Sequence, residues 1–539
     1  MTSFAATGWQ EEDGTWVYYN RAGEKVANAW EYSGDNRFYL DDAGNMATDS
    51  LIEDNDDYYY VDANGAMVRN RWVAIDNEEA GEENQPDVWW YYFQANGKAY
   101  KNTHASGNIF KKVINGKTYA FDEDGKMQYG WVKKEDGVTN YDDNAYQECD
   151  YYFGDENDGA MSIGWREIAL TDVADAETEQ PGDSYWDSDQ VRWFYFKSSG
   201  MKQTSSTNKT INGRKYGFDE WGRMIADWHA ATANDADNQL SRRGSSNNAA
   251  VTATKDYARD FMYFSSPEDG ARFTKGWFKV VPGYYLNYKD YDDGTDRWYY
   301  ANGDGKIAAG EIKAIKGKKY AFDLKGGMIS GLALLRTNGK EISEYADSDG
   351  KYDSQDSFET TARGLSGDWG FYYFSDNEDK DGSMKTGNQR ISLDGENFTF
   401  SFRKGGTRKG QGINGLNEKK YYLGGMLMTA DADTKIELLN KNTLEKVTVD
   451  KFVRTNGLVG KDVTSGKVGQ ANKGDVVYTD GTTGTTGTAT GLDLTSLTAD
   501  YVVVNVSGNV VKSGSKVDGD GYKVVLDGNN RVKQIIATY

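Results

Sequence analysis

Histidine, proline and cysteine are nearly absent from this sequence of 539 residues, which holds two His, four Pro and one Cys. The single thiol, Cys149, cannot form an internal disulfide and has no partner for a redox pair. His104 and His229 are too few for a zinc site, and neither lies near a Gly-x-Ser-x-Gly motif. Because imidazole and thiol groups are so scarce, we expect a protein that is not an enzyme.

Long apolar runs and an excess of positive charge are also missing. No run of about 18 apolar residues occurs, so we predict no membrane span. The 62 basic residues are outnumbered by 84 acidic ones, which gives a net charge of −22. This balance argues against a nucleic-acid partner and suits a cationic or neutral ligand. The opening MTSFAATGWQ lacks the basic and apolar regions of a signal peptide, and we expect that any secretion signal has been removed.

Aromatic side chains are what the sequence has in excess, with 38 Tyr and 15 Trp. Such rings can bury one face and leave a polar tip in water. Many belong to a short unit, an aromatic strand that ends at a glycine turn. TWVYYNRAG, NRFYLDDAG and DYYYVDANG end at Gly23, Gly44 and Gly65, which are 21 residues apart. Alternating aromatic residues followed by Asp/Asn-x-x-Gly predict β-hairpins.

A longer motif repeats on top of this unit. INGKTYAFDEDGKM at Ile114 returns as INGRKYGFDEWGRM at Ile211 and IKGKKYAFDLKGGM at Ile315, with a fourth, altered copy at Ile413. The spacings of 97, 104 and 98 residues define a cassette of about 100 residues with inserted loops. Because one hairpin is marginally stable alone, hairpins must stack on each other. We predict an all-β fold in which residues 1–430 form an elongated solenoid of stacked hairpins.

The repeat pattern stops near residue 430. From Asp431 onward the sequence has no Trp, Pro or His, and its charges cancel, so the repeats carry the net charge. We predict that residues 431–539 form a compact C-terminal β-domain with a hairpin turn at Gly528-Asn529-Asn530. Its long apolar strands offer an edge to another chain, and we expect self-association, or association with another surface component, through this domain.

Segments such as GWQEEDGTWVYYNRAGEKVANAW and DGKMQYGW resemble the cell-wall-binding repeats of Gram-positive surface proteins. That family includes choline-binding modules, glucan-binding domains of glucosyltransferases and the repeat tails of clostridial toxins. Its pattern is roughly G-W-x(5,6)-W-Y-Y-x(5)-G-x-M-x-x-G-W, and the resemblance covers about residues 8–428. It implies a secreted protein of the bacterial surface that binds choline on cell-wall teichoic acid, or a glycan.

The resemblance also implies candidate ligand-binding residues, because choline-binding relatives hold their ligand between hairpins in a cage of aromatic rings near a methionine. The matching Trp-x-Tyr pairs are Trp16 and Tyr18, Trp90 and Tyr92, Trp193 and Tyr195, and Trp298 and Tyr300. The tryptophans that close a repeat are Trp9, Trp131, Trp165 and Trp277, with Trp30, Trp72 and Trp228 in the same place without the preceding glycine. We expect the most complete cage to use Trp16, Tyr18 and Trp30.

The Tyr-x-Phe strands of the longer motif do not have the Trp-Tyr-Tyr of a cage. We therefore predict that Phe121, Phe218 and Phe322 are core residues, that the Asp-x-x-Gly turns the chain, and that the Met fills the gap below.

One acidic run suggests a metal. ADSDGKYDSQD places Asp347, Asp349 and Asp353 at a spacing close to that of a calcium loop. The distal glutamate of an EF-hand is missing, so calcium is the one cofactor that the sequence suggests, and its support is weak. Two other functions stay open: a structural subunit of an extracellular filament or surface layer, and a receptor-binding adhesin that uses the variable loops.

Overall fold

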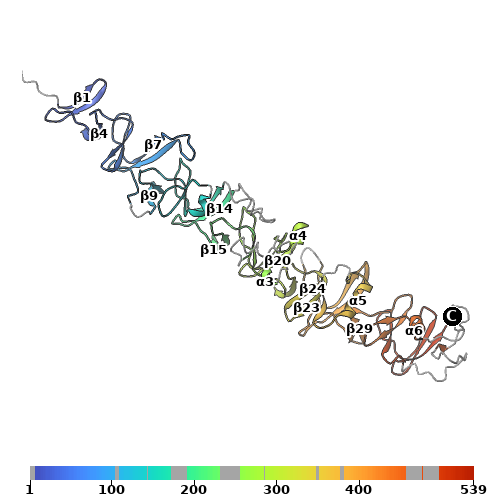
Figure 1. The fold of residues 1–539 in the computed structure, drawn as a ribbon. Helices are drawn as coiled ribbons and strands as arrows, with labels where there is room; N and C mark the ends of the chain where they lie inside the picture. Colours follow the sequence, from blue (N-terminus) through green and yellow to red (C-terminus); the bar gives the residue numbers. More distant parts are fainter. Residues whose placement is uncertain are drawn as a thin grey trace, which may run out of the picture. The chain divides into compact units, whose positions relative to one another are not determined.

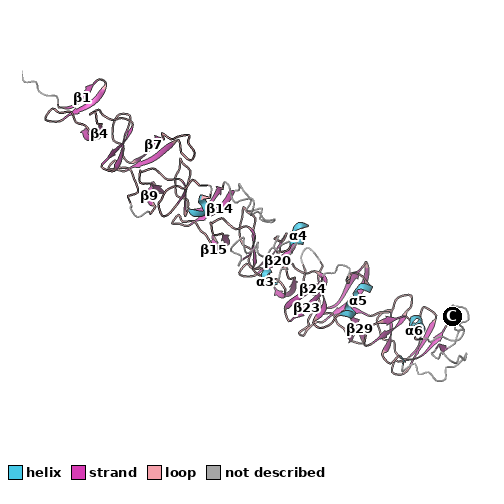
Figure 2. Ribbon diagram, viewed as in Figure 1, coloured by secondary structure: helices cyan, strands magenta, loops and turns pink. Residues whose placement is uncertain are grey.

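The computed structural model of this chain describes residues 7–103, 108–142, 144–170, 191–230, 255–283, 286–346, 351–376, 381–456, 476–477 and 497–538. The chain divides into two compact units. The first comprises Met1–Asn234 and Tyr263–Phe273, and the second comprises Asp235–Met262 and Thr274–Tyr539. Strands dominate both units, and the described helices are short (Figure 1 and Figure 2).

The first unit is a succession of two-stranded antiparallel hairpins. They pair β1 (Gly8–Glu12) with β2 (Thr15–Tyr19), β3 (Ala29–Ser33) with β4 (Asn36–Leu40), β5 (Ser50–Asp54) with β6 (Asp57–Val61), β7 (Arg71–Asp76) with β8 (Val88–Phe93), β9 (Phe110–Ile114) with β10 (Lys117–Phe121), β11 (Gly130–Val132) with β12 (Tyr151–Phe153), β13 (Gly164–Ala169) with β14 (Val191–Phe196), and β15 (Ser206–Ile211) with β16 (Arg214–Phe218). Helix α1 (Ala145–Glu148) lies between β11 and β12, and β17 (Asp227–Ala230) follows β16. Strand β18 (Phe261–Phe264) contributes its last two residues to this unit.

The second unit begins with hairpins and continues into larger antiparallel sheets. Its elements up to the second five-stranded sheet are α3 (Lys255–Ala258), the pair β19 (Gly276–Val280) and β20 (Arg297–Ala301) with α4 (Tyr288–Asp292) between them in the chain, then β21 (Glu311–Ile315), β22 (Lys318–Phe322), β23 (Gly331–Asn338), β24 (Glu341–Ala346), α5 (Gln355–Gly364), β25 (Trp369–Phe374), β26 (Gly387–Leu393), β27 (Glu396–Phe402), β28 (Gly415–Asn417), β29 (Lys420–Leu423) and β30 (Met426–Leu427). The two five-stranded sheets have the orders β22-β21-β24-β23-β25 and β26-β27-β30-β29-β28. The prediction of an all-β chain of repeated hairpins is confirmed.

The last elements of the second unit form two further sheets. They are β31 (Ile436–Asn440), β32 (Lys446–Val447), α6 (Val449–Thr455), β33 (Val476–Val477), β34 (Tyr501–Asn505), β35 (Gly514–Val517), β36 (Tyr522–Leu526) and β37 (Val532–Ala537), in the orders β32-β31-β34 and β33-β37-β36-β35. Strands β36 and β37 pair across the predicted turn. One core cluster, which includes Leu438, Val503 and Ile535, lies within this segment, whereas Leu439 and Val504 pack into a cluster with the preceding repeats. The separate C-terminal β-domain stays a prediction.

The three clear copies of the longer motif share one tight turn. The φ values are 48° and 84° at Asn115–Gly116, 48° and 81° at Asn212–Gly213, and 47° and 83° at Lys316–Gly317. A type I′ hairpin turn requires positive φ at both central residues, and an Asn-Gly pair adopts it readily. The motif therefore closes its hairpin by local backbone preference.

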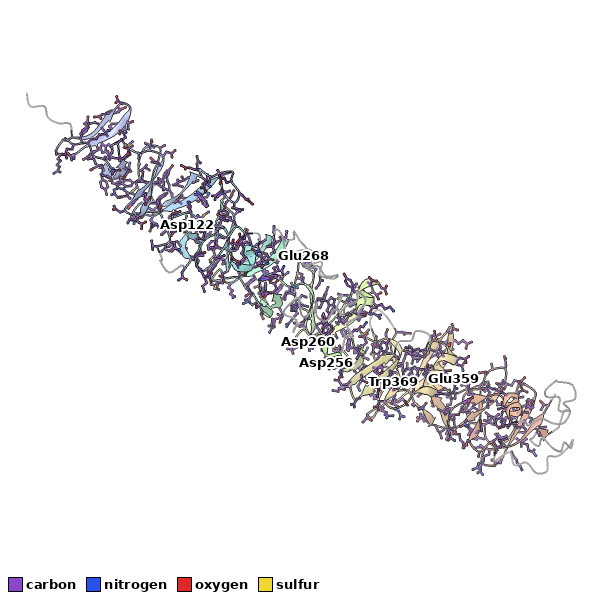
Figure 3. The ribbon with its side chains drawn as sticks, viewed as in Figure 1. Asp122, Asp256, Asp260, Glu268, Glu359 and Trp369 are labelled. Carbon is purple, nitrogen blue, oxygen red and sulfur yellow. The ribbon has the colours of Figure 1, made fainter. Side chains whose placement is uncertain are left out.

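An aspartate organises the second turn of each copy. Asp122 Oδ1 accepts hydrogen bonds from the backbone N–H groups of Asp124 and Lys126, at 3.0 and 2.8 Å. Asp219 and Asp323 accept the equivalent bonds from the residues two and four positions later. The predicted role of Asp-x-x-Gly as a turn is confirmed. Burial raises the pKa of Asp122, which is labelled in Figure 3, to about 6.

A methionine joins each copy to the repeats on either side. The backbone N–H of Met127 donates to Trp90 O, that of Met224 to Trp193 O and that of Met328 to Trp298 O, each at 2.8 Å. The thioether then fills space beside the turn glycine of the following repeat. A Cβ added at Gly382 would lie 2.5 Å from Sδ and Cε of Met328, although the φ of Gly382 is not left-handed. A larger residue at this position would therefore displace the methionine side chain.

The phenylalanine of each copy lies in the core. Phe121, Phe218 and Phe322 expose 0%, 1% and 0% of their surface, so the predicted core positions are confirmed. Each shares a hydrophobic cluster with the isoleucine of its own motif, namely Ile114, Ile211 and Ile315.

Candidate ligand-binding site

The closing tryptophan of a hairpin faces a tyrosine on the other strand of the same hairpin. The cross-strand pairs are Trp9 and Tyr18, Trp30 and Tyr39, Trp72 and Tyr92, Trp131 and Tyr152, Trp165 and Tyr195, and Trp277 and Tyr300. Their ring centroids are 5.0–5.3 Å apart, with planes inclined by 63–71°. The antiparallel register places directly opposed side chains close together, so each hairpin supplies the first two rings of a cluster.

The third ring comes from the next hairpin in the chain. Tyr119, Tyr216 and Tyr320 have their centroids 4.8 Å from those of Trp72, Trp165 and Trp277, at 64°, 67° and 65°. These tyrosines are the first aromatic residue of the Tyr-x-Phe strand. The motif thus buries its phenylalanine and presents its tyrosine to the tryptophan of the preceding hairpin.

A second tryptophan completes the set on the same strand as the hairpin tyrosine. Trp193 lies 6.3 Å from Trp165, and Trp298 lies 6.4 Å from Trp277, with nearly perpendicular planes. Trp90 packs in the same hydrophobic cluster as Trp72. We define three clusters: the Trp72 cluster (Trp72, Trp90, Tyr92, Tyr119), the Trp165 cluster (Trp165, Trp193, Tyr195, Tyr216) and the Trp277 cluster (Trp277, Trp298, Tyr300, Tyr320).

The exposure of these rings separates them from the core. The two tryptophans and the hairpin tyrosine of every cluster are half-buried, whereas the phenylalanine of the next hairpin is fully buried. Burial raises the pKa of Tyr119, which keeps its phenol neutral at physiological pH. Each cluster is therefore a partly exposed group of aromatic rings, whose faces carry negative potential and attract a cation.

The N-terminal hairpin forms a related set. The ring centroid of Trp9 lies 5.3 Å from those of Tyr18 and Phe38. Trp16, which is 44% exposed, is equivalent to the second tryptophan of the three clusters, because its backbone carbonyl accepts a hydrogen bond from the N–H of Met46. Trp30 instead contacts Tyr39 and Tyr59. The ring contacts thus assign Tyr18 and Trp30 to different clusters. As ligand contacts, Trp16, Tyr18 and Trp30 stay a prediction.

Trp131 heads a cluster in which the equivalent positions differ. Its centroid lies 5.0 Å from that of Tyr152 and 5.1 Å from that of Phe194, which stands where the other clusters have a tyrosine. Asp150 is equivalent to the second tryptophan. Its backbone carbonyl accepts a hydrogen bond from the N–H of Lys202 at 2.8 Å, just as the carbonyl of Trp193 accepts one from the N–H of Met224. We call this set the Trp131 cluster (Trp131, Asp150, Tyr152, Phe194).

Sequence reasoning finds the first two rings but misses the third. From sequence alone, the tyrosines Tyr119, Tyr216 and Tyr320 are expected to pack like the core phenylalanines of the same strands. Strand alternation carries the missing signal, because Tyr and Phe in Tyr-x-Phe point to the same face and the tyrosine lies nearer the tight turn. That this face contacts the tryptophan of the preceding hairpin follows from how consecutive hairpins pack on each other.

The suggested calcium ligands are not brought together by the described structure. Asp347 and Asp349 lie outside the described residues, and Asp353 Oδ1 accepts from Ser357 Oγ at 3.0 Å. Among the residues that the structure describes, no group of three or more His, Cys, Asp or Glu side chains is placed to hold a metal ion. Calcium binding stays a prediction.

Comparison with known sequences supports the repeat assignment. Residues 24–66 match the choline-binding repeat family, so the predicted resemblance is confirmed. Over 367 residues the chain is 28% identical to Glucosyltransferase-S of Streptococcus mutans serotype c, a match that covers 61% of this chain and 21% of that protein. The chain thus spans about a fifth of the length of this curated relative.

Solved structures with similar repeats come from Streptococcus pneumoniae. Choline binding protein F, in the presence of a peptidoglycan analogue, is 17% identical, and the match covers 76% of this chain and 100% of that one with a TM-score of 0.31. The modular autolysin LytC, in complex with a synthetic peptidoglycan ligand, is also 17% identical, with 65% and 59% covered and a TM-score of 0.31. Within the described part of the chain, none of the helices has the length and apolar character needed to cross a membrane.

Proposed function

We propose that this chain, which carries a choline-binding repeat at residues 24–66, is a non-enzymatic binding protein of a Gram-positive cell surface. Its Trp72, Trp165 and Trp277 clusters hold the trimethylammonium group of choline on cell-wall teichoic acid. The observation that carries this proposal is the threefold recurrence of one ring arrangement, in which each closing tryptophan has a tyrosine at 5.2–5.3 Å and another at 4.8 Å.

The energetics suit a weak site used many times. A quaternary ammonium gains about 0.5–2 kcal/mol from each aromatic face that it contacts. Two or three faces then give millimolar affinity, since a Kd of about 1 mM corresponds to about −4 kcal/mol. A chain with several such sites binds a polymer that carries many cholines far more tightly than it binds free choline. The net charge of −22 further favours a cationic ligand.

His229 and Cys149 are the imidazole and the thiol that the structure describes. Burial lowers the pKa of His229 to about 4, so this imidazole is a poor base at neutral pH. Burial raises the pKa of Cys149 to about 12, so its thiol stays protonated. Both groups are thus unsuited to nucleophilic catalysis.

A fluorescence titration tests the proposal. Choline should change the tryptophan emission of the wild-type protein at millimolar concentration, whereas its uncharged isostere 3,3-dimethylbutan-1-ol should have a much smaller effect. Trp165→Leu and Trp277→Leu should each remove part of the change. Leucine is a suitable replacement because Leu51 and Leu332 already stand opposite Tyr60 and Tyr373 in the same register.

The outcomes separate the ligand classes. An equal response to choline and to the neutral isostere would contradict recognition of a cation. A response to soluble glucan but not to choline would assign the same rings to a carbohydrate. Unchanged circular dichroism in the leucine variants is the control for the fold.

A further inference from the structure

Many of the repeats carry a methionine at one position, and Lys202 is a buried lysine at that position. Other residues found there include Lys25, Ala99, Arg272 and Ile307. Met161 and Met224 pair with Phe153 and Phe218 through an isolated β-bridge, and Lys202 pairs with Phe196 in the same way. The aliphatic stem of Lys202 also does the packing work of the methionine. A Cβ added at Gly222, the next turn glycine, would lie 2.7 Å from Cγ and Cδ of Lys202.

The ammonium of Lys202 ends at the aromatic rings of the Trp131 cluster. Its Nζ lies 5.3 Å from the ring centroid of Trp131, within the range of a cation–π contact, and it donates a hydrogen bond to Tyr146 O. The residue is only 6% exposed. Burial lowers the pKa of Lys202 to about 8, which leaves it mainly charged at neutral pH. A positive charge is thus held at a tryptophan ring without any bound ligand.

The Trp30 hairpin has a similar arrangement by a different route. Arg37 stands in the place of the second tryptophan, because its carbonyl accepts from Met67 N–H at 2.8 Å as that of Trp90 accepts from Met127. The guanidinium carbon of Arg37 lies 4.9 Å from the ring centroid of Trp30. Two different positions of the repeat have therefore placed a cation of the chain over a closing tryptophan.

The rings of Trp72, Trp165 and Trp277 have no such cation among the residues that the structure describes. In the Trp165 cluster the guanidinium of Arg214 lies 5.8 Å from the ring centroid of Tyr216, not over Trp165, and it is paired with Asp269 at 2.6 Å. The Trp30 and Trp131 rings are thus already contacted by a cation, whereas the Trp72, Trp165 and Trp277 rings are not contacted by a cation of the described residues.

We define the Trp30 cluster as Trp30, Arg37, Tyr39 and Tyr59. We propose that Lys202 and Arg37 act as built-in ligands that close the Trp131 cluster and the Trp30 cluster, respectively, to external quaternary ammonium groups. This inference rests on the proposed choline-binding function and adds to it which junctions bind. The self-filled clusters keep the hairpin stacking of the repeats, and external ligand enters where the closing tryptophan is uncovered.

Isothermal titration with choline chloride tests the proposal through a gain of sites. Lys202→Met installs the residue that neighbouring copies carry at this position as Met161 and Met224, so the fold has an internal precedent. It should raise the number of cholines bound per chain by one, and Lys202→Met combined with Trp131→Leu should return that number to the wild-type value. Arg37→Trp introduces the tryptophan that the three clusters have at the equivalent position, and it should also add one choline site.

The controls separate this inference from the proposed function. A wild-type protein that binds no choline would refute the proposed function itself. A wild-type protein that binds choline while Lys202→Met and Arg37→Trp both keep its stoichiometry, with unchanged circular dichroism, would overturn only the closure of these clusters. If Lys202→Met fails to fold, Lys202→Gln retains a donor for Tyr146 O, removes the charge and should also add a site; an unchanged stoichiometry in that folded variant would count against closure.

Discussion

The Trp165 cluster and the Trp131 cluster share the same ring geometry but differ in whether a cation of the chain contacts the closing tryptophan. In both, the closing tryptophan has its cross-strand tyrosine at 5.0–5.3 Å and an aromatic residue of the next hairpin at 4.8–5.1 Å. Three equivalent positions differ, where Trp193, Tyr216 and Met224 are replaced by Asp150, Phe194 and Lys202. The comparison teaches that ring geometry comes with the hairpin stacking, while the residues around the tryptophan determine whether a cation is already present.

The shared framework predicts the largest effect. Phe196 and Phe218 hold the same core position in the two clusters, with 0% and 1% exposed. Replacing either with Ala should cost about 3–5 kcal/mol of stability. In repeats that contact mainly their neighbours, the loss should be seen as local proteolytic sensitivity near the substituted hairpin. Limited proteolysis followed by mass spectrometry checks both variants, and protection unchanged in either one would break the equivalence of the two cores.

The aspartate turn predicts a smaller effect that depends on pH. Asp122 has a folded pKa of about 6 against a usual value of 3.8, because burial disfavours the charged form. Above pH 6 the buried charge costs its full amount, and the cost falls as the pH drops from 6 to 4 because the folded state takes up the proton first. Asp122→Asn should therefore be about 2 kcal/mol more stable than wild type at pH 7, with a difference that shrinks toward pH 4.

Asn20 and Asn302 already cap equivalent turns, so the fold accepts asparagine there. Asp219→Asn is the contrasting variant, because it removes an ion pair with Arg223 at 2.7 Å and should destabilise. Urea unfolding from pH 4 to 7 measures both. A destabilised Asp122→Asn protein at pH 7 would show that the carboxylate is needed there.

Lys202 and Met224 differ in charge, and this predicts another pH dependence. Lys202 has a folded pKa of about 8 against a usual value of 10.5, with burial as the main cause; Cys149, Asp219 and Asp150 favour the charged form. Below pH 8 the lysine is charged in both states and its burial cost is fully present. Between pH 8 and 10.5 the folded state binds fewer protons than the unfolded state, so stability rises with pH. Relative to Lys202→Met, wild type should gain about 2 kcal/mol between pH 7.5 and 9.5, measured by urea unfolding. A constant difference between the two proteins would mean that Lys202 keeps an ordinary pKa.

The methionine contact shared by the repeats predicts the smallest effect. Gly382→Ala places a Cβ against the thioether of Met328 and should cost about 1 kcal/mol, because the flexible side chain can partly give way. Gly405→Ala is the matched control, since nothing lies within 4 Å of its Cβ and its φ is not left-handed. Thermal unfolding compares the two, and equal midpoints would show that the methionine does not fill this space.

The sequence was sufficient for the hairpins, their turns and the buried phenylalanines, because these depend on local backbone preference and on strand alternation. Trp165 and Trp277 could likewise be chosen from the repeat pattern alone. The third ring of each cluster could not, because Tyr119 and its equivalents reach the tryptophan only through the stacking of one hairpin on the next. The contact of Lys202 with Trp131 depends on the same stacking. By contrast, Trp9 pairs with Tyr18, and Arg37 contacts Trp30, within a single hairpin. An alignment of the copies does place Lys202, like Lys25, at the position where many copies have methionine.

The most direct test of the central claim is equilibrium dialysis of labelled choline against the wild-type chain and the triple variant Trp72→Leu, Trp165→Leu, Trp277→Leu. We expect at least three bound cholines per wild-type chain at saturation and three fewer for the triple variant, with the β-sheet circular dichroism of both proteins unchanged. A triple variant that binds as much choline as the wild type would contradict the assignment of the ligand to these clusters.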